Sequence, residues 1–428
     1  MSQTMGGGFV GAMGGVGLWL SLATAACGST DVSAGSEGDA INLGHCYGAD
    51  CGVRVQAIMG AGVEVASCAE PSAELEEPLA FEQAGDDLQA GAIRVAPDGS
   101  VWVLERDRGN PNGELPSVAL AHFSADGELL GTSGAIQTGN IHTWTEHDLA
   151  VDSSGVATVA VYTSFAATAD SEVIEQLKLF SYDSELNPVG APLVFHGVAT
   201  PKLAGANSGT YWLAGNAIAN APHGVVSRVD GREPVWIQTG VPTSGQGAGV
   251  GVSGLVVASD GTTAVLSQRS PRWSGGPDVY RYGVATFDAQ GRSVWNLELP
   301  TMYTGGYPAA LAGTPEGDLV VEGVTNQQGL ATISSVSRSG ELGWAFEIES
   351  RAEADVDIDS EGRTFAATNH GVAVIDADGQ SCRQLSVPLG DGIASGALPS
   401  LGSPRVRGNY IYLTNDSGLS RYTLPTDY

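Results

Sequence analysis

Two groups of carboxylates are the residues of this sequence with the clearest potential for chemistry. Glu146, His147 and Asp148 are consecutive, and carboxylates on both sides shift a histidine towards its protonated form. Further along, acidic residues alternate with apolar ones at Glu353, Asp355, Asp357 and Asp359. On an innermost strand this alternation would place the carboxylates near one axis, where they would either hold Ca²⁺ or line a solvent-filled channel mouth. Their spacing is not that of an EF-hand loop. We therefore assign no catalytic residue and no metal ligand from sequence.

The cysteines indicate disulfide bonds. Outside the first thirty residues there are four, an even number, at Cys46, Cys51, Cys68 and Cys382. In an oxidising compartment they allow two disulfides in any of three connectivities. Zinc is the rival interpretation, but the chain has no Cys-x2-Cys pair and His45 is the one imidazole near Cys46. No cofactor is predicted.

The sequence lacks the familiar catalytic signatures. It contains no G-x-S-x-G elbow, no H-E-x-x-H and no phosphate-binding G-x-x-x-x-G-K-[ST]. The net charge is −29, from 48 acidic and 19 basic residues, which repels phosphate backbones. Nucleic acid is thus excluded as a partner, and most of the charge is interpreted as a solubilising surface.

The elements that must position these residues come from a repeated hairpin. Each copy has alternating apolar residues, a tight turn that ends in Gly and then another apolar run. Six copies are Ile93–Gly99, Leu149–Gly155, Leu203–Gly209, Leu255–Gly261, Leu311–Gly317 and Val356–Gly362, and a weaker seventh is Arg405–Leu413. Asp-Gly and Ser-Gly turns supply the positive φ that tight hairpins require. A second hairpin with its own Gly turn lies between copies, as in Ala285–Trp295 and Val336–Trp344.

Two hairpins make a four-stranded sheet, and the sheets recur at the spacing of propeller blades. One such sheet cannot bury both faces, whereas sheets packed radially can. We therefore predict an all-β fold, a seven-bladed β-propeller of four-stranded antiparallel blades; a sandwich or two-sheet barrel does not explain seven similar units. The last unit lacks an outermost strand. Pro78–Gln83 has the length and pattern to fill that place, so an N-terminal strand is predicted to close the ring.

The loops of this fold carry the candidate binding face. All the tight turns fall on one rim, so the long connections lie on the opposite face, where function is usually carried. They hold aromatic and polar residues of the types enriched at binding hot spots, namely His142, Trp144, His147, Arg272, Trp273, Tyr280, Tyr303 and Tyr307. The alternative is that each aromatic covers its own loop or plugs a blade junction.

The N-terminal segment indicates export. Residues 5–26 are uncharged and contain the apolar run Val16–Ala23, followed by small residues and then Cys27. This arrangement resembles the lipobox of bacterial lipoproteins, which implies that Cys27 is lipidated. It departs from that pattern because no Lys or Arg precedes the run and Thr24 replaces the usual Leu. A cleaved secretory peptide or a retained membrane helix is the alternative. The predicted organisation is a signal peptide over 1–27, a flexible tether and small Cys-containing segment over 28–76, and the propeller over 77–428.

The repeats resemble known families. Leu149–Thr163 is similar to the SBBP-type and NHL-type propeller repeats of secreted bacterial proteins, and Phe287–Trp295 to the PQQ-type repeat of quinoproteins and outer-membrane assembly propellers. The resemblance covers about residues 90 to 424 and implies an architecture, not an activity.

These observations favour a non-enzymatic surface or periplasmic lipoprotein. We expect it to bind a protein or a glycan at the long-loop face and to reach the membrane through its lipid anchor. Gly28 after Cys27 resembles outer-membrane sorting; a secreted or periplasmic location is the alternative. The alternative function is a propeller enzyme, a lyase, hydrolase or quinoprotein-like oxidoreductase, with its site at the axial channel mouth.

Overall fold

A computed structural model of the full chain describes part of the sequence, all of it within the compact unit Ser33–Tyr428. The described residues are strands and turns, and no helical segment among them has the length and hydropathy to span a bilayer. They are 41–42, 58–59, 65–68, 71–75, 79–81, 89–107, 116–138, 147–165, 174–205, 208–217, 224–231, 233–241, 250–269, 281–299, 309–324, 330–349, 355–368, 371–387, 402–415 and 418–425.

The described residues form seven small sheets, which we number as blades 1 to 7 in chain order. Blade 1 contains β6 (Gln89–Val95), β7 (Val101–Asp107), β8 (Ser117–Phe123), β9 (Leu129–Thr132) and β10 (Ile136–Gln137). Blade 2 contains β11 (His147–Val151), β12 (Ala157–Phe165), β13 (Ile174–Tyr182) and β14 (Leu193–His196). Blade 3 contains β15 (Val198–Gly205), β16 (Thr210–Ala217), β17 (Gly224–Asp230) and β18 (Glu233–Val241).

The remaining blades repeat this pattern. Blade 4 contains β19 (Val250–Val257), β20 (Thr263–Arg269), β21 (Arg281–Phe287) and β22 (Ser293–Glu298). Blade 5 contains β23 (Ala310–Gly313), β24 (Leu319–Val324), β25 (Leu330–Val336) and β26 (Leu342–Glu349). Blade 6 contains β27 (Val356–Ile358), β28 (Thr364–Ala367), β29 (Gly371–Ile375) and β30 (Cys382–Ser386), and blade 7 contains β31 (Gly402–Arg407), β32 (Tyr410–Asn415) and β33 (Gly418–Thr423).

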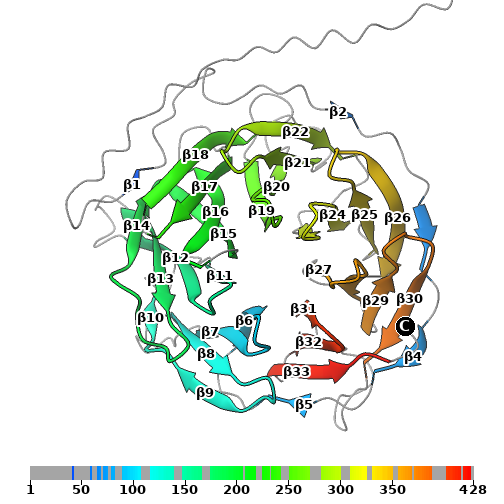
Figure 1. The fold of residues 1–428 in the computed structure, drawn as a ribbon, viewed down its shortest axis with the longest axis horizontal. Coiled ribbons are helices and arrows are strands. Elements are labelled where there is room, and N and C mark those ends of the chain that lie inside the picture. Colours follow the sequence, from blue (N-terminus) through cyan, green and yellow to red (C-terminus); the bar gives the residue numbers. More distant parts are fainter. Residues whose placement is uncertain are drawn as a thin grey trace, which may run out of the picture. The chain divides into compact units, whose positions relative to one another are not determined.

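The blades stand in a ring around an axis, as Figure 1 shows. Each innermost strand contacts the innermost strand of the next blade, and β31 of blade 7 contacts β6 of blade 1. The apolar core is divided among the seams between blades: the described residues contain one buried apolar cluster for each pair of neighbouring blades. The predicted seven-bladed β-propeller is therefore confirmed.

The turn glycines explain why the sequence repeats. Both Gly99 and Gly155 have positive φ, 87° and 83°, and donate their N–H to the residue three positions earlier. An Asp at the start of a turn adds side-chain bonds: Asp152 Oδ1 accepts from the N–H groups of Ser154 and Val156. The same φ region holds the other predicted turn glycines of the first hairpin, at positions 209, 261, 317 and 362.

Tryptophans on outermost strands join neighbouring blades. Trp236 of β18 donates its indole N–H to the Ala289 carbonyl at 3.0 Å, and Trp295 of β22 donates to the Arg338 carbonyl at 2.8 Å. Each acceptor lies two residues before a turn glycine of the next blade. A Cβ atom on Gly291 would lie 2.6 Å from the Trp236 ring, so a larger residue there would collide with the indole.

An N-terminal belt of five short strands runs along the outer edges of the blades. It comprises β1 (Ile41–Asn42), β2 (Ile58–Met59), β3 (Val65–Ser67), β4 (Pro71–Glu74) and β5 (Leu79–Ala80). The first four pair in parallel with the outermost strands of blades 2, 4, 5 and 6. From sequence we expected residues 28–76 to be a tether and a small Cys-containing segment. Strands of two to four residues are too short to show a periodicity, which is why the belt was not predicted.

The last belt strand closes the ring. β5 pairs antiparallel with β33, with Ala80 opposite Ser420 and Leu79 opposite Arg421. The Phe81 N–H then donates to the Leu419 carbonyl at 3.0 Å. The predicted closure of blade 7 by an N-terminal strand is confirmed.

One disulfide ties the belt to the blades. Cys68, directly after β3, is bonded to Cys382 of β30 in blade 6, across a sequence separation of 314 residues. Cys382 is buried in the cluster between blades 5 and 6, and Cys68 packs against the same cluster. Cys46 and Cys51 lie outside the described residues, so their pairing stays a prediction.

Candidate functional site

Most residues predicted for the long-loop face lie outside the described residues, and the binding face stays a prediction there. They are His142, Trp144, Arg272, Trp273, Tyr280, Tyr303 and Tyr307, and the lipidation candidate Cys27 is in the same position. His147 is described: it is half-buried at the start of β11 and pairs with Val161. Of the acidic groups, Glu146 and Glu353 are not described, whereas Asp148, Asp355, Asp357 and Asp359 are.

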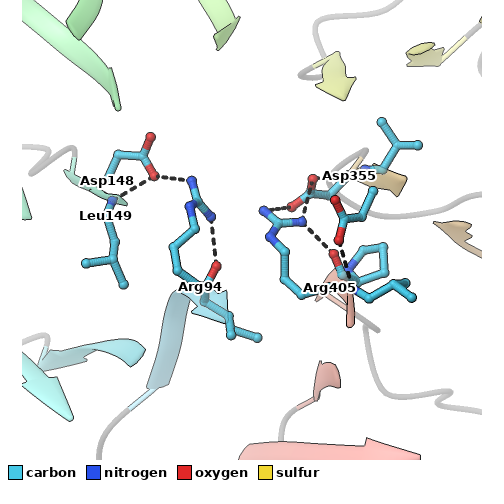
Figure 2. Close-up of polar contacts among 10 residues, drawn as sticks. Arg94, Asp148, Leu149, Asp355 and Arg405 are labelled. Carbon is cyan, nitrogen blue, oxygen red and sulfur yellow. Dashed lines mark hydrogen bonds and ion pairs between the residues drawn. The ribbon is translucent and has the colours of Figure 1, made fainter. Parts of the chain in front are cut away.

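Two ion pairs from four different blades meet at the axis. Arg94 of β6 donates through Nη2 to Asp148 Oδ1 at 3.2 Å. Arg405 of β31 contacts Asp355 with both terminal nitrogens, at 3.2 and 3.1 Å. Figure 2 shows the two guanidinium groups pointing toward each other, with the carboxylates on their far sides. We call Arg94, Asp148, Asp355, Asp357 and Arg405 the axial cluster.

The carboxylates of the axial cluster also fasten one blade to the next. Asp148 Oδ2 accepts the Leu203 N–H of blade 3 at 2.7 Å, and Asp357 Oδ2 accepts the Val406 N–H of blade 7 at 2.7 Å. Asn216 makes a similar bond between blades 3 and 4, where its Oδ1 accepts the Val252 N–H at 2.7 Å. A side-chain oxygen thus repeatedly caps a backbone donor on the next innermost strand. These charged groups are part of the joints of the ring.

Burial shapes the ionisation of this region. Burial lowers the pKa of Arg94, although Asp148 opposes that change. Burial also acts to lower the pKa of Arg405, but the carboxylates of Asp355 and Asp357 outweigh it and the pKa is raised. The pKa of Asp357 is raised by burial, and the positive charge of Arg405 limits the rise.

Glu322 of β24 is a buried acid beside the axial cluster. It is 0% exposed, and no hydrogen bond of normal geometry from the described residues reaches either carboxyl oxygen. Burial raises its pKa well above the ordinary value; the Asp355 carboxylate adds to the rise, and the Asp355 backbone N–H offsets part of it. Burial and the Asp355 carboxylate therefore both favour the protonated form of Glu322, beside the joint between blades 5 and 6.

The axial cluster suits a structural role better than catalysis. Among the described residues, no three His, Cys, Asp or Glu side chains are grouped so that they could hold a metal ion. Asp359, expected to alternate with the others along the strand, instead caps its own turn: it accepts the N–H groups of Glu361 and Arg363 and pairs with the Arg363 guanidinium at 2.7 Å. The carboxylates that do reach the axis are bonded to arginines and to backbone donors.

Sequence reasoning found the acids of this cluster and missed its bases. The repeat pattern predicts Arg94 and Arg405 only as strand positions. A usable signal was present, because a chain with 19 basic residues places an Arg in the innermost strand of two blades that become neighbours only after closure.

A second candidate site lies on the outer rim, where blades 1 and 2 meet. It is a groove of about 480 Å³, open to solvent. One wall is the β10 edge of blade 1 and the residues before it, and the other is the β13 face of blade 2 with the turn after it. The lining residues are Gly134, Ala135, Ile136, Gln137, Lys178, Phe180, Tyr182, Leu186 and Pro188. We call it the rim groove; nothing in the sequence pattern marked it.

Comparisons with known proteins identify the fold. No protein-family model matches the sequence, and no curated protein matches it. Among solved structures, virginiamycin B lyase from Staphylococcus aureus is similar at a TM-score of 0.52 and 12% identity, over 82% of this chain and 99% of that one. BamB from Moraxella catarrhalis has a TM-score of 0.42 and 14% identity, over 82% and 98%. An α-L-arabinanase from Penicillium chrysogenum has a TM-score of 0.46 and 11% identity, over 73% and 97%. At 12% identity the likeness to virginiamycin B lyase shows the propeller fold alone.

Proposed function

We propose that this protein is a non-enzymatic envelope lipoprotein whose propeller is a scaffold for binding another protein or a glycan. One observation carries the proposal: the charged groups at the axis are bonded to one another and to backbone donors of neighbouring blades, whereas the rim groove is open to solvent and lined by both apolar and polar residues. Loops and edges of a rigid scaffold are where recognition is usually placed. The long-loop face stays a second predicted binding surface.

The proposal includes export and anchorage. The uncharged segment over 5–26 followed by Cys27 supports a lipidated N-terminus at the surface or periplasmic side of the outer membrane. The repeat resemblance to SBBP-type, NHL-type and PQQ-type propellers is consistent with an exported protein. Metabolic labelling with an alkyne fatty acid tests the anchor: the wild-type chain should carry the label and Cys27→Ser should not.

Site-specific photo-crosslinking in the native envelope tests the scaffold. A photoreactive residue at position 137, which borders the rim groove, should give an adduct with a discrete partner. The matched control is position 294 of blade 4, where Val294 is 56% exposed on another part of the rim. Absence of adducts from position 137 and from positions on the long-loop face would contradict the scaffold function.

A propeller enzyme is the second candidate, and Glu322 is the observation that favours it. A buried carboxyl group whose pKa is raised by burial and by the neighbouring Asp355 is an arrangement that can donate a proton. Its complete burial argues against contact with a substrate. A screen for glycoside hydrolysis and polysaccharide elimination decides between them, because an activity abolished in Glu322→Gln, with an unchanged melting temperature, would reverse our ranking.

A further inference from the structure

We propose that the rim groove binds an extended segment of a partner protein, as an added β-strand along β10 that presents an acidic side chain to Lys178. This inference rests on the proposed scaffold function and specifies its partner. It follows from how the blades use their outer edges, from the free edge of β10 and from the chemistry of the groove.

The outer edges of blades 2, 4, 5, 6 and 7 already accept added strands. β1, β2, β3 and β4 each extend a blade as a fifth, parallel strand, and β5 completes blade 7. Segments of two to four residues are sufficient for this pairing. Among the described residues, no strand pairs with the outer side of β10 in blade 1. An unpaired edge is a template for an incoming strand.

The backbone of β10 presents free groups outward. The Thr138 N–H points inward and donates to the Pro116 carbonyl at 3.0 Å. Successive backbone N–H groups along a strand point to opposite sides, so the Gln137 N–H points away from blade 1. Gln137 is exposed and opposes Ser117 in the register of the sheet. The outer side of Gln137 is therefore the place where an added strand would bond.

The facing wall has the spacing of an extended peptide. Lys178, Phe180 and Tyr182 alternate along β13, so their side chains lie on one face about 7 Å apart. Tyr182 is buried, and Phe180 is half-buried within the cluster between blades 1 and 2. Side chains on one face of a bound strand have the same period. An acidic residue opposite Lys178 and an apolar residue two positions away match this wall.

Charge complementarity selects the acidic partner. Lys178 makes no ion pair or hydrogen bond with any described residue, and it is one of two lysines in a chain of net charge −29. Lys178 is half-buried as a residue, and a lysine without a counter-ion favours a carboxylate from a partner. The remaining lining is mainly apolar, which suits aliphatic side chains better than the hydroxyls of a glycan.

A charge-swap experiment on the full chain tests the inference. The probes are three fluorescent hexapeptides, acetylated and amidated, of sequence Val-Thr-Xaa-Thr-Val-Thr with Xaa as Glu, Lys or Ser, so that the residues two positions from Xaa are apolar. The wild-type protein should bind the Glu peptide most tightly in fluorescence anisotropy. Lys178→Glu should weaken that binding by about tenfold and should bind the Lys peptide better than the wild type does. Lys202→Glu on β15 makes the same charge change away from the groove and should leave binding unchanged.

The backbone contribution is tested separately. Gln137→Pro removes the outward N–H while leaving the inward Thr138 bond in place, and should weaken the Glu peptide by about fivefold. Melting temperatures show whether each variant is folded. An unchanged affinity in folded Lys178→Glu, or no saturable binding of any peptide up to about 1 mM, would overturn the inference. Self-association of the wild type that Lys178→Glu abolishes, without peptide binding, would assign the groove to a second copy instead.

The two proposals fail in different ways. If a chain with the photoreactive residue at position 137 captures the same envelope partner undiminished when it also carries Lys178→Glu, the scaffold function stands and the added strand is wrong. If no envelope partner is captured from any tested surface but the peptides bind as expected, the groove is correct and the proposed cellular role is wrong.

Discussion

Two seams of the ring make the same kind of contact with different residues. They are the seam between blades 4 and 5 and the closing seam between blades 7 and 1. In the first, the Trp295 indole donates to the Arg338 carbonyl and lies against Gly340. In the closing seam, the guanidinium of Arg421 donates to the Ala125 carbonyl, and Leu79 of the belt lies against Gly127. Both acceptors precede the turn glycine by two residues. A seam made within the repeat can use one rigid tryptophan, whereas the closing seam is assembled from two distant parts of the chain.

The internal seam should depend most strongly on its single large side chain. Trp295 is 8% exposed, and Trp295→Ala is expected to destabilise the fold by about 3–5 kcal/mol, because the indole fills the joint and no neighbour can replace it. Urea unfolding monitored by circular dichroism measures the change. Trp295→Phe is the control, and it should lose less because it keeps most of the apolar contact. Equal losses in the two variants would contradict the packing argument.

The closing seam should depend on the covalent anchor of the belt. Replacing Cys68 and Cys382 together by Ser is expected to cost about 2–4 kcal/mol, since the disulfide closes a long loop. The loss should be accompanied by faster hydrogen exchange in β33, which β5 covers, and little change in β17 of blade 3. Reduction of the wild type should reproduce the effect. Uniform exchange across all blades would show that the anchor does not act on closure.

A pair of glycines compares the two seams directly. Gly340 and Gly127 both have φ of +86°, so an alanine carries similar backbone strain at each. A Cβ on Gly340 would lie 3.0 Å from the rigid Trp295 ring, whereas one on Gly127 would lie 3.3 Å from the flexible end of Leu79. Gly340→Ala should therefore be less stable than Gly127→Ala by about 1 kcal/mol, measured by urea unfolding. The reverse order would contradict the proposed role of the indole.

The sequence predicts the repeated hairpins better than it predicts the N-terminal belt. Tight turns need residues that tolerate positive φ, so Gly155 and Gly317 indicate their hairpins in the sequence. The last unit lacks an outermost strand, and this predicted the pairing of β5 with β33. One turn was not marked by a glycine: Leu186 has φ of 63° in the second turn of blade 2, where blades 1, 3, 4, 5 and 6 have Gly. The belt strands were not predicted either, because backbone pairing alone leaves little pattern in the side-chain types.

The candidate sites were less predictable for a physical reason. Asp148 and Asp355 stood out as acids in or beside a strand, yet their bonds depend on Arg94 and Arg405, which reach them across the seams between blades 1 and 2 and between blades 6 and 7. The rim groove depends on a gap in edge pairing and on the relation of β10 to β13, which no local pattern encodes. Sequence therefore indicates the residues near the axis and not their bonds.

The seam between blades 5 and 6 offers a pH-dependent contrast with the closing seam. The pKa of Glu322 is raised by burial, so its folded form holds a proton that the unfolded chain releases above about pH 4.3. Its contribution to stability is complete below that pH and is lost as the pH rises towards its folded pKa. Glu322→Gln removes this dependence. As the pH rises from 5 to 6, the free energy of unfolding of the wild type should therefore fall relative to that of the variant by up to about 1.4 kcal/mol. Asp357, whose pKa is also raised, is present in both proteins and cancels in the difference. Parallel stability curves for the two proteins would mean that Glu322 is ionised in the folded state and paired by a group that the described residues do not include.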